Sequence, residues 1–261
     1  MSRRPKIAAI VTEYRKFSHG QHIVDRFLEG YGWNSRHHRP EMDVVSIYVD
    51  QFPEGDLTRD RVARFPTMKL YPTIADALTL GGNTLAVDGV LLIGEHGEYA
   101  WNEKDQHMYP RKYFLEQICG VMATSKRGIP VFNDKHLSYN WHDAKWMYDR
   151  MRSLNAPFMA GSSLVTCWRS PFLEHPKETP LAEALVVSYS GLDVYGFHAL
   201  ETLQCMVERR KGGESGIVAV QMIEGDEVWA AGDAGRWSWR LRPPRAATPG
   251  WARARGSRSC C

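Results

Sequence analysis

Residues 87–94 read VDGVLLIG and form the most apolar run in the chain, bounded by Asp88 and Gly94. A short, continuous apolar run without regular polar alternation is typical of a strand buried on both faces of a parallel sheet. Two earlier runs have the same character, KIAAIVT at 6–12 and MDVVSIYV at 42–49. Together the three runs predict the centre of a parallel β-sheet.

Segments with helical periodicity separate the apolar runs. Apolar residues at 23, 24, 27, 28 and 31 form one stripe of a helix expected over 22–31. Further helices are expected over 74–80, 113–123 and 141–154, and further strands over 128–133 and 157–161. Strands that alternate with helices build right-handed βαβ units. The sequence therefore predicts an α/β fold, a Rossmann-like doubly wound parallel sheet over residues 1–161 that binds a dinucleotide.

The pattern changes after residue 161. Prolines precede a strand expected over 185–190, a helix from about 193 to 210 and a strand over 217–223. We expect residues 162–235 to be the start of a truncated α+β domain for substrate binding or oligomerisation. With so few residues, such a domain is small for an independent core.

The positive charge of the chain is confined to its last residues. Residues 236–261 hold seven arginines and no acidic residue, whereas the other 26 basic and 30 acidic residues give positions 1–235 a net charge of −4. The segment lacks strand or helix periodicity, so we expect a basic, low-order tail. It is either a basic interaction arm or a stretch read out of frame after about Gly235, which would explain the truncation as well.

Composition also limits the partners and the compartment. No apolar run reaches the roughly 18 residues that cross a membrane, and no nucleic-acid motif accompanies the basic tail. Cys119, Cys167 and Cys205 lie far apart without CxxC spacing, which indicates a reducing compartment. We expect a cytoplasmic protein that binds neither nucleic acid nor membrane.

The carboxyl ends of the expected strands hold the candidate cofactor-binding residues, because ligands of such sheets bind there. After the first strand, the start of a helix could bind phosphate through its free N–H groups, although Gly20 stands alone where GxGxxG has three glycines. Asp50 is placed to accept ribose hydroxyls. For each candidate a capping or solvated side chain is the ordinary alternative. The candidates are Thr12, Ser18, His19, Gly20, Asp50, Gly94, Glu95, His96 and Asp134.

A strand that runs directly into charged residues is the strongest local feature of the sequence. VFNDKHLS at 131–138 places Asp134, Lys135 and His136 between a strand and a helix. Burial would lower the pKa of this lysine and suit it to proton transfer, whereas a surface Asp–Lys pair that caps a turn is the ordinary alternative. We expect no metal, since the histidines show no ligand spacing. A metal site would need Glu95, His96, Asp134 and His136 to converge.

The ordered set of segments resembles a known family. IAAIVT, VVSIYVD, YPTIADAL, VDGVLLIG, PVFNDKHLSYNWHDAKWMYDRMRSLNAPFMAGS and YGFHALETLQ are similar to the glucose-fructose oxidoreductase, inositol dehydrogenase and rhizopine-catabolism (Gfo/Idh/MocA) family. The resemblance covers about residues 6–230 and is closest over 72–162. It implies a Rossmann domain that binds NAD or NADP, a sheet domain after it, hydride transfer to or from a sugar or polyol hydroxyl carbon, and a homo-oligomer.

The same resemblance assigns the catalytic residues. The family lysine, which contacts substrate and assists proton transfer, falls on Lys135, with Asp134-Lys135-His136 in place of Glu-Lys-Pro. The histidine of the family's G-x-H motif falls on His198, and Asp193 lies one place before the position of the usual acid. The resemblance implies that His198 is the general acid/base, that Lys135 polarises the hydroxyl and that Asp193 tunes one of them.

Two other functions stay open at this point. The missing glycines favour a non-catalytic Rossmann-like module or a truncated inactive homologue. A metal-dependent hydrolase or isomerase would use the four convergent residues named above.

Overall fold

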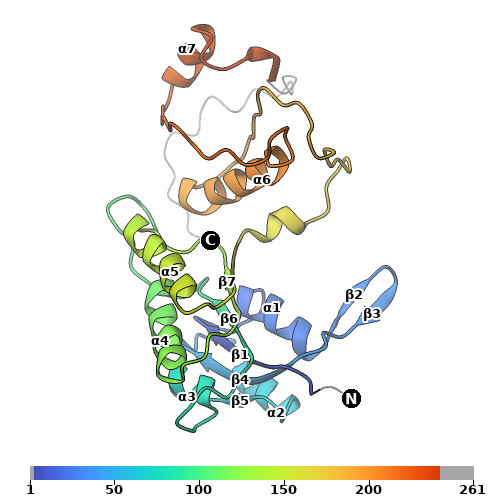
Figure 1. The fold of residues 1–261 in the computed structure, drawn as a ribbon, viewed down its shortest axis with the longest axis vertical. Helices are drawn as coiled ribbons and strands as arrows, with labels where there is room; N and C mark the ends of the chain where they lie inside the picture. Colours follow the sequence, from blue (N-terminus) through green and yellow to red (C-terminus); the bar gives the residue numbers. More distant parts are fainter. Residues whose placement is uncertain (1–2, 242–261) are drawn as a thin grey trace. The chain divides into compact units, whose positions relative to one another are not determined.

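The computed structural model describes residues 3–241, and a parallel β-sheet forms the core of its first 161 residues (Figure 1). Its strands run in the order β5-β4-β1-β6-β7-β8, and every pairing is parallel. This is the strand order of a doubly wound dinucleotide-binding fold, and the predicted fold class is confirmed. The strands are β1 (Lys6–Val11), β4 (Asp43–Val49), β5 (Lys69–Leu70), β6 (Gly89–Ile93), β7 (Val131–Asp134) and β8 (Phe158–Gly161).

Helices cover both faces of the sheet (Figure 1). They are α1 (His19–Leu28), α2 (Thr58–Arg64), α3 (Ile74–Thr79), α4 (Arg111–Thr124) and α5 (Trp141–Ser153). Along β1, Ala8 and Ile10 join the core cluster built with α3, α4 and α5. Ala9 and Val11 join the second cluster, built with α1. Both faces of β1 are therefore buried, which is why its sequence shows no alternation.

One local difference from the expected elements follows α1. The helix ends at Leu28, and the chain forms a hairpin of β2 (Tyr31–Trp33) and β3 (Arg36–His38). Its two turn residues, Asn34 and Ser35, have φ angles of 48° and 58°. A two-residue turn with positive φ matches the twist of a hairpin, but Asn-Ser lacks the glycine that usually signals it.

The chain divides into two compact units, residues 1–168 with 189–201 and residues 169–188 with 202–261. The division differs from the boundary expected after residue 161, because residues 189–201 return to the ends of β7 and β8. This returning segment contains a π-helical turn, Leu192–Gly196, and the start of α6 (Phe197–Val207). Every candidate site residue lies in the first unit.

In the second unit, the described residues form helices but no strand. The strands expected over 185–190 and 217–223 are wrong, and Val218 and Val220 are exposed. A strand needs a neighbour for its N–H and C=O groups, and none of residues 162–241 supplies one. The helix expected from about 193 to 210 corresponds to the π-helical turn and α6.

The beginning of the expected tail packs on α7 (Glu227–Asp233). Trp237 donates a hydrogen bond from its Nε1 to the carbonyl of Val228 at 3.0 Å, and its ring lies where a Cβ on Gly232 would be. Residues 236–241 are thus ordered against a helix. Residues 242–261 lie outside the described part. No helix within residues 3–241 is both long and apolar enough to cross a bilayer.

Packing at the start of β7 leads to a stability prediction. A Cβ on Gly128 would lie 2.4 Å from the carbonyl oxygen of Leu154 at the end of α5, so Gly128→Ala should lower the free energy of unfolding by about 1–3 kcal/mol. Gly120→Ala, on the exposed side of α4 with no atom within 4 Å, should raise it by about 0.5–1 kcal/mol. Urea unfolding of both variants tests the packing, and a neutral Gly128→Ala would contradict it.

Candidate functional site

The candidate site lies at the carboxyl ends of β1, β6, β7 and β8. Lys135 follows β7 with a φ of 72°, a conformation that is costly for a residue with a side chain. Hydrogen bonds of 3.1 Å in both directions join its backbone to Gly161 at the end of β8. The Asn133 side-chain Nδ2 donates to the carbonyls of residues 134, 135 and 136. These bonds hold the turn that presents Lys135.

Lys135 meets the histidine expected from the family motif. Its Nζ lies 2.6 Å from Nε2 of His198, and the His198 Nδ1 lies 2.5 Å from Oγ of Ser162. All three residues are buried. The structure therefore brings together Lys135 and His198, which are 63 positions apart in the sequence, and adds Ser162, which sequence reasoning missed.

The protonation of His198 follows from its surroundings. Burial and then the neighbouring Lys135 lower the pKa of His198, so the ring is neutral at pH 7. A lysine ammonium has only donors, so it donates to Nε2, and the ring proton then lies on Nδ1 and is donated to Ser162. His198 is held as a base whose Nε2 faces the ammonium of Lys135.

A buried ion pair contacts the turn that holds Lys135. The Arg111 Nη2 lies 2.6 Å from Oε2 of Glu95, and Arg111 is only 1% exposed. Arg111 also donates from Nη1 to Nε2 of His136 at 3.0 Å, while Oε1 of Glu95 lies 3.8 Å from Nζ of Lys135. Gly94 makes room for the arginine, because a Cβ there would lie 2.6 Å from its Cγ. Lys135, Arg111 and Glu95 thus give the cluster a formal excess of one positive charge.

Two further predicted residues form a second contact beside β7. The His19 Nδ1 lies 2.5 Å from Oδ2 of Asp134, and the rings of His19 and His96 meet edge to face at 5.1 Å. Nε2 of His96 is buried without a hydrogen-bond partner among the described residues. Burial and then His19 lower the pKa of His96 to about 4. This unpartnered nitrogen lies at the edge where ligands of the fold bind.

The predicted residues at the end of β1 have structural contacts of their own. Thr12 donates its hydroxyl to the carbonyl of Glu95 at 2.7 Å and so links the ends of β1 and β6. Ser18 caps α1 by accepting from the N–H of Gln21. A Cβ on Gly20 would lie 2.5 Å from the carbonyl of Glu13, so the helix starts close against the preceding loop.

Side chains hold the loop where glycine-rich sequences occur in dinucleotide-binding folds. The carboxylate of Glu13 is buried and lies 2.6 Å from Nε of Arg15. Burial is the main cause that raises the pKa of Glu13. Tyr14 is buried as well, and its hydroxyl donates to Asp25. The loop is therefore more filled than a glycine-rich one.

The carboxylate of Asp50 lies at the end of β4, as predicted. It accepts hydrogen bonds of 2.7 Å from the hydroxyls of both Tyr48 and Tyr99. The next residue, Gln51, exchanges side-chain hydrogen bonds with the backbone of Glu98. The loop after β6 is thus tied to the end of β4.

The remaining catalytic candidate is bonded to the loop after β6. Asp193 accepts a hydrogen bond of 3.3 Å from the backbone N–H of His107. A different acid, Glu201, reaches the cluster backbone and accepts from the N–H of Ser162 at 3.0 Å. Arg111 and Ser162 carried no sequence signal, since neither belongs to a motif and their partners are distant in sequence.

The structure does not bring the four residues of the possible metal site together. Glu95 and His136 are both bonded to Arg111, and Asp134 is paired with His19. Among residues 3–241, no group of three or more histidine, cysteine or acidic residues is placed to hold a metal ion. Within the described residues, the four do not form the site that a metal-dependent hydrolase or isomerase would need.

Comparison with solved structures finds proteins that are similar to part of this chain. Biliverdin reductase from Synechocystis sp. PCC 6803, in complex with biliverdin and NADP+, is 11% identical with a TM-score of 0.38 over 60% of this chain and 37% of its own. GenD2 from gentamicin A biosynthesis, in complex with NAD, is 15% identical, and the match has a TM-score of 0.39. It covers 62% of this chain and 35% of GenD2. A probable dehydrogenase from Thermotoga maritima is 15% identical, and the match has a TM-score of 0.39. It covers 60% of this chain and 35% of the dehydrogenase.

The chain spans little more than a third of the length of these three proteins. No protein-family model matches it, and neither does any curated protein.

Two half-buried histidines make stability depend on pH. The pKa of His136 is lowered to about 3 by burial and then by Arg111, as that of His96 is lowered to about 4. Below about pH 6.5 these two histidines bind protons in the unfolded chain but stay neutral in the folded chain. Stability should therefore be complete above pH 6.5 and fall toward pH 4, by up to about 1.4 kcal/mol per pH unit for each histidine.

His96→Asn tests this dependence, because asparagine tolerates the φ of 70° at this position and does not titrate. Urea unfolding between pH 7 and 4.5 should show a shallower loss for the variant than for the unchanged chain. Equal slopes would contradict the neutral state of His96 in the folded chain.

Proposed function

We propose that the protein is an NAD(P)-dependent oxidoreductase of the Gfo/Idh/MocA type, which transfers hydride to or from a hydroxyl carbon of a sugar or polyol. The observation that carries the proposal is the buried contact of 2.6 Å between Nζ of Lys135 and Nε2 of His198. It pairs a proton donor with a base at the carboxyl edge of a sheet whose strand order is that of dinucleotide-binding folds. The sequence resemblance assigns the chemistry to the same two residues.

The residues at this edge of the sheet offer the contacts that a dinucleotide needs. The loop between β1 and α1 carries buried side chains where related loops carry glycines. The N-terminus of α1, with Arg15 and Lys16 before it, would hold the diphosphate. Asp50 would hold a ribose, since its two tyrosine partners use about half of the lone pairs of a carboxylate. The unpartnered Nε2 of His96 offers a further polar contact. The negative charge of the Glu13 carboxylate is neutralised by its ion pair with Arg15.

When bound, the nicotinamide would accept or supply the hydride. In the direction of oxidation, the Lys135 ammonium would shift its hydrogen bond from Nε2 of His198 to the substrate oxygen, which frees the Nε2 lone pair. The substrate O–H bond would then break and its proton pass to Nε2, while the C–H electron pair leaves as hydride to the bound nicotinamide and the alcohol becomes a carbonyl. The ammonium of Lys135 donates to the substrate oxygen and stabilises its developing negative charge. Ser162 keeps the imidazole in the orientation and tautomer that this transfer needs.

A non-catalytic Rossmann-like module is the second candidate. The observation that favours it is the loop between β1 and α1, where buried Glu13 and Tyr14 occupy the space that glycines leave for a diphosphate.

Calorimetric titration of the full chain with NAD+ and NADP+ separates the two candidates. The proposal predicts binding of one cofactor at millimolar concentration or below, and the absence of heat with a folded sample would contradict it. Lys135→Met should lower kcat/KM for oxidation of D-glucose or myo-inositol by about 100-fold or more while cofactor binding persists. Lys145→Met, on the exposed side of α5, is the matched control. Unchanged turnover in Lys135→Met would remove the assigned role.

A further inference from the structure

The turn of the β2–β3 hairpin and Trp168 line a pocket of about 440 Å³ in the first unit, which we call the hairpin pocket. Its volume is within the range of about 300–1,000 Å³ that is usual for small-molecule sites. The lining consists of residues 32–37 and Trp168, and none of these residues is acidic. None of them belongs to the proposed catalytic cluster or to the candidate cofactor-binding residues.

Two indole rings form the aromatic side of the hairpin pocket. The ring centroids of Trp33 and Trp168 lie 5.7 Å apart, and the ring planes meet at 70°. This edge-to-face contact joins the two rings but leaves them open to solvent, since Trp33 is 49% exposed and Trp168 is 83% exposed. Exposed indole faces of this kind can stack on a planar ring of a ligand.

A guanidinium without a protein partner lies on the same side of the hairpin. Arg36 is paired with Trp33 across the two-residue turn, and directly opposite residues of an antiparallel pair project from the same face. Arg36 is exposed, and it forms no hydrogen bond or ion pair with any residue of the part that the structure describes. Because the lining holds no carboxylate, the positive charge of Arg36 is not neutralised within the pocket.

The two histidines of the hairpin fix its shape. The Nε2 of His37 donates to the carbonyl of Glu29 at 2.9 Å, and the Nε2 of His38 donates to the carbonyl of Trp33 at 3.1 Å. The ring of His38 also stacks on Tyr31, with the ring centroids 5.6 Å apart. The backbone of the hairpin is therefore held in place before a ligand binds, which lowers the entropic cost of binding.

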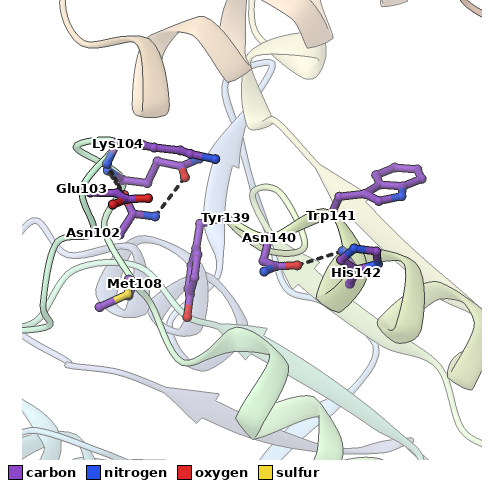
Figure 2. A pocket seen from close by; sticks show the side chains of 9 residues that line it. Asn102, Glu103, Lys104, Met108, Tyr139, Asn140, Trp141 and His142 are labelled. Atoms are coloured by element: carbon purple, nitrogen blue, oxygen red, sulfur yellow. Dashed lines mark hydrogen bonds between the residues drawn. The ribbon is translucent and has the colours of Figure 1, made fainter.

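A larger pocket of the first unit lacks this combination. It has a volume of about 540 Å³ and lies between the loop after β6 and the start of α5 (Figure 2). The adjacent residues Glu103 and Lys104 give its lining charges of both signs. Figure 2 shows the indole of Trp141 extending away from Tyr139, and Trp141 forms no ring contact with another aromatic residue of the described part. This pocket therefore offers neither an aromatic pair nor an unbalanced arginine or lysine.

The two features of the hairpin pocket select a ligand that has both a ring and a negative charge. Arg36 would repel a cation, although an aromatic wall alone would suit one. A small anion without a ring would gain only an exposed ion pair with Arg36, which contributes little to affinity. The planar guanidinium of an arginine matches the oxygens of a carboxylate or phosphate group, and the indoles supply the remaining contact area.

We infer that the hairpin pocket binds an aromatic anion, a planar ring that carries a carboxylate or phosphate group. The ring stacks on the indoles of Trp33 and Trp168, and the oxygens of the anionic group accept hydrogen bonds from Arg36. The inference is independent of the proposed oxidoreductase function, because the pocket shares no residue with that site.

NMR of the full chain labelled with ¹⁵N-tryptophan tests the inference, with 1-naphthyl phosphate as the probe. The indole N–H signals of Trp33 and Trp168 should shift saturably, with half-saturation at about 1 mM or below. The signal of Trp141, an exposed tryptophan outside the pocket, should not move. Each signal is assigned from the variant in which phenylalanine replaces that tryptophan.

Two substitutions separate the contributions of the charge and the ring. Arg36→Gln should weaken binding of 1-naphthyl phosphate about tenfold, because it removes the charge-assisted hydrogen bonds. Trp168→Ala should weaken binding about tenfold as well and leave the melting temperature unchanged, since this side chain is largely exposed. Arg59→Gln is the matched control, because Arg59 is an exposed arginine of α2 that is bonded to no described residue. This control should bind the probe as the unchanged chain does.

The inference is overturned if neither Trp33 nor Trp168 responds to the probe, or if 1-naphthol, which lacks the negative charge, binds as tightly as 1-naphthyl phosphate. It is also overturned if inorganic phosphate alone shifts both signals at the same concentration, or if Arg59→Gln loses as much binding as Arg36→Gln.

Discussion

The ion pair between Glu95 and Arg111 is the interaction on which the candidate site depends. It joins the end of β6 to the first residue of α4 with both side chains buried. Removing one partner of such a pair typically costs about 3–5 kcal/mol, because the other charge stays behind without compensation. Arg111 also holds His136, and Glu95 approaches Lys135, so this pair contacts two neighbouring residues of the turn after β7. The positive charge of Lys135 is thereby accommodated in a buried position.

Much of the first unit could be predicted because its strands are buried on both sides. Alternate residues of β1 enter different core clusters, so the whole strand is apolar and stands out in the sequence. The hairpin of β2 and β3 could not be predicted in this way, since its residues are exposed and its turn lacks glycine. The segment 217–223 misled the prediction, because an apolar run becomes a strand only where another strand pairs with it.

Site residues that belong to a sequence motif could be predicted, whereas those outside any motif could not. Lys135 and His198 came from motifs, and the structure places their side chains in contact, while their catalytic roles stay a proposal. Arg111 and Ser162 depend on partners brought close only by the fold, so no spacing announces them. Gly94 and Thr12 have structural contacts that no motif signals: the glycine leaves room for Arg111, and the threonine joins two strands.

His198 is neutral, accepts a hydrogen bond from Lys135 and donates one to Ser162. Nitrogen NMR of the full chain labelled with ¹⁵N-histidine measures this state directly. At pH 7 the His198 ring should show a protonated Nδ1 and an unprotonated Nε2, and Ser162→Ala should disturb the Nδ1 signal. A doubly protonated ring, or a proton on Nε2, would contradict the hydrogen bond from Lys135 to Nε2 of His198 that the proposed chemistry requires.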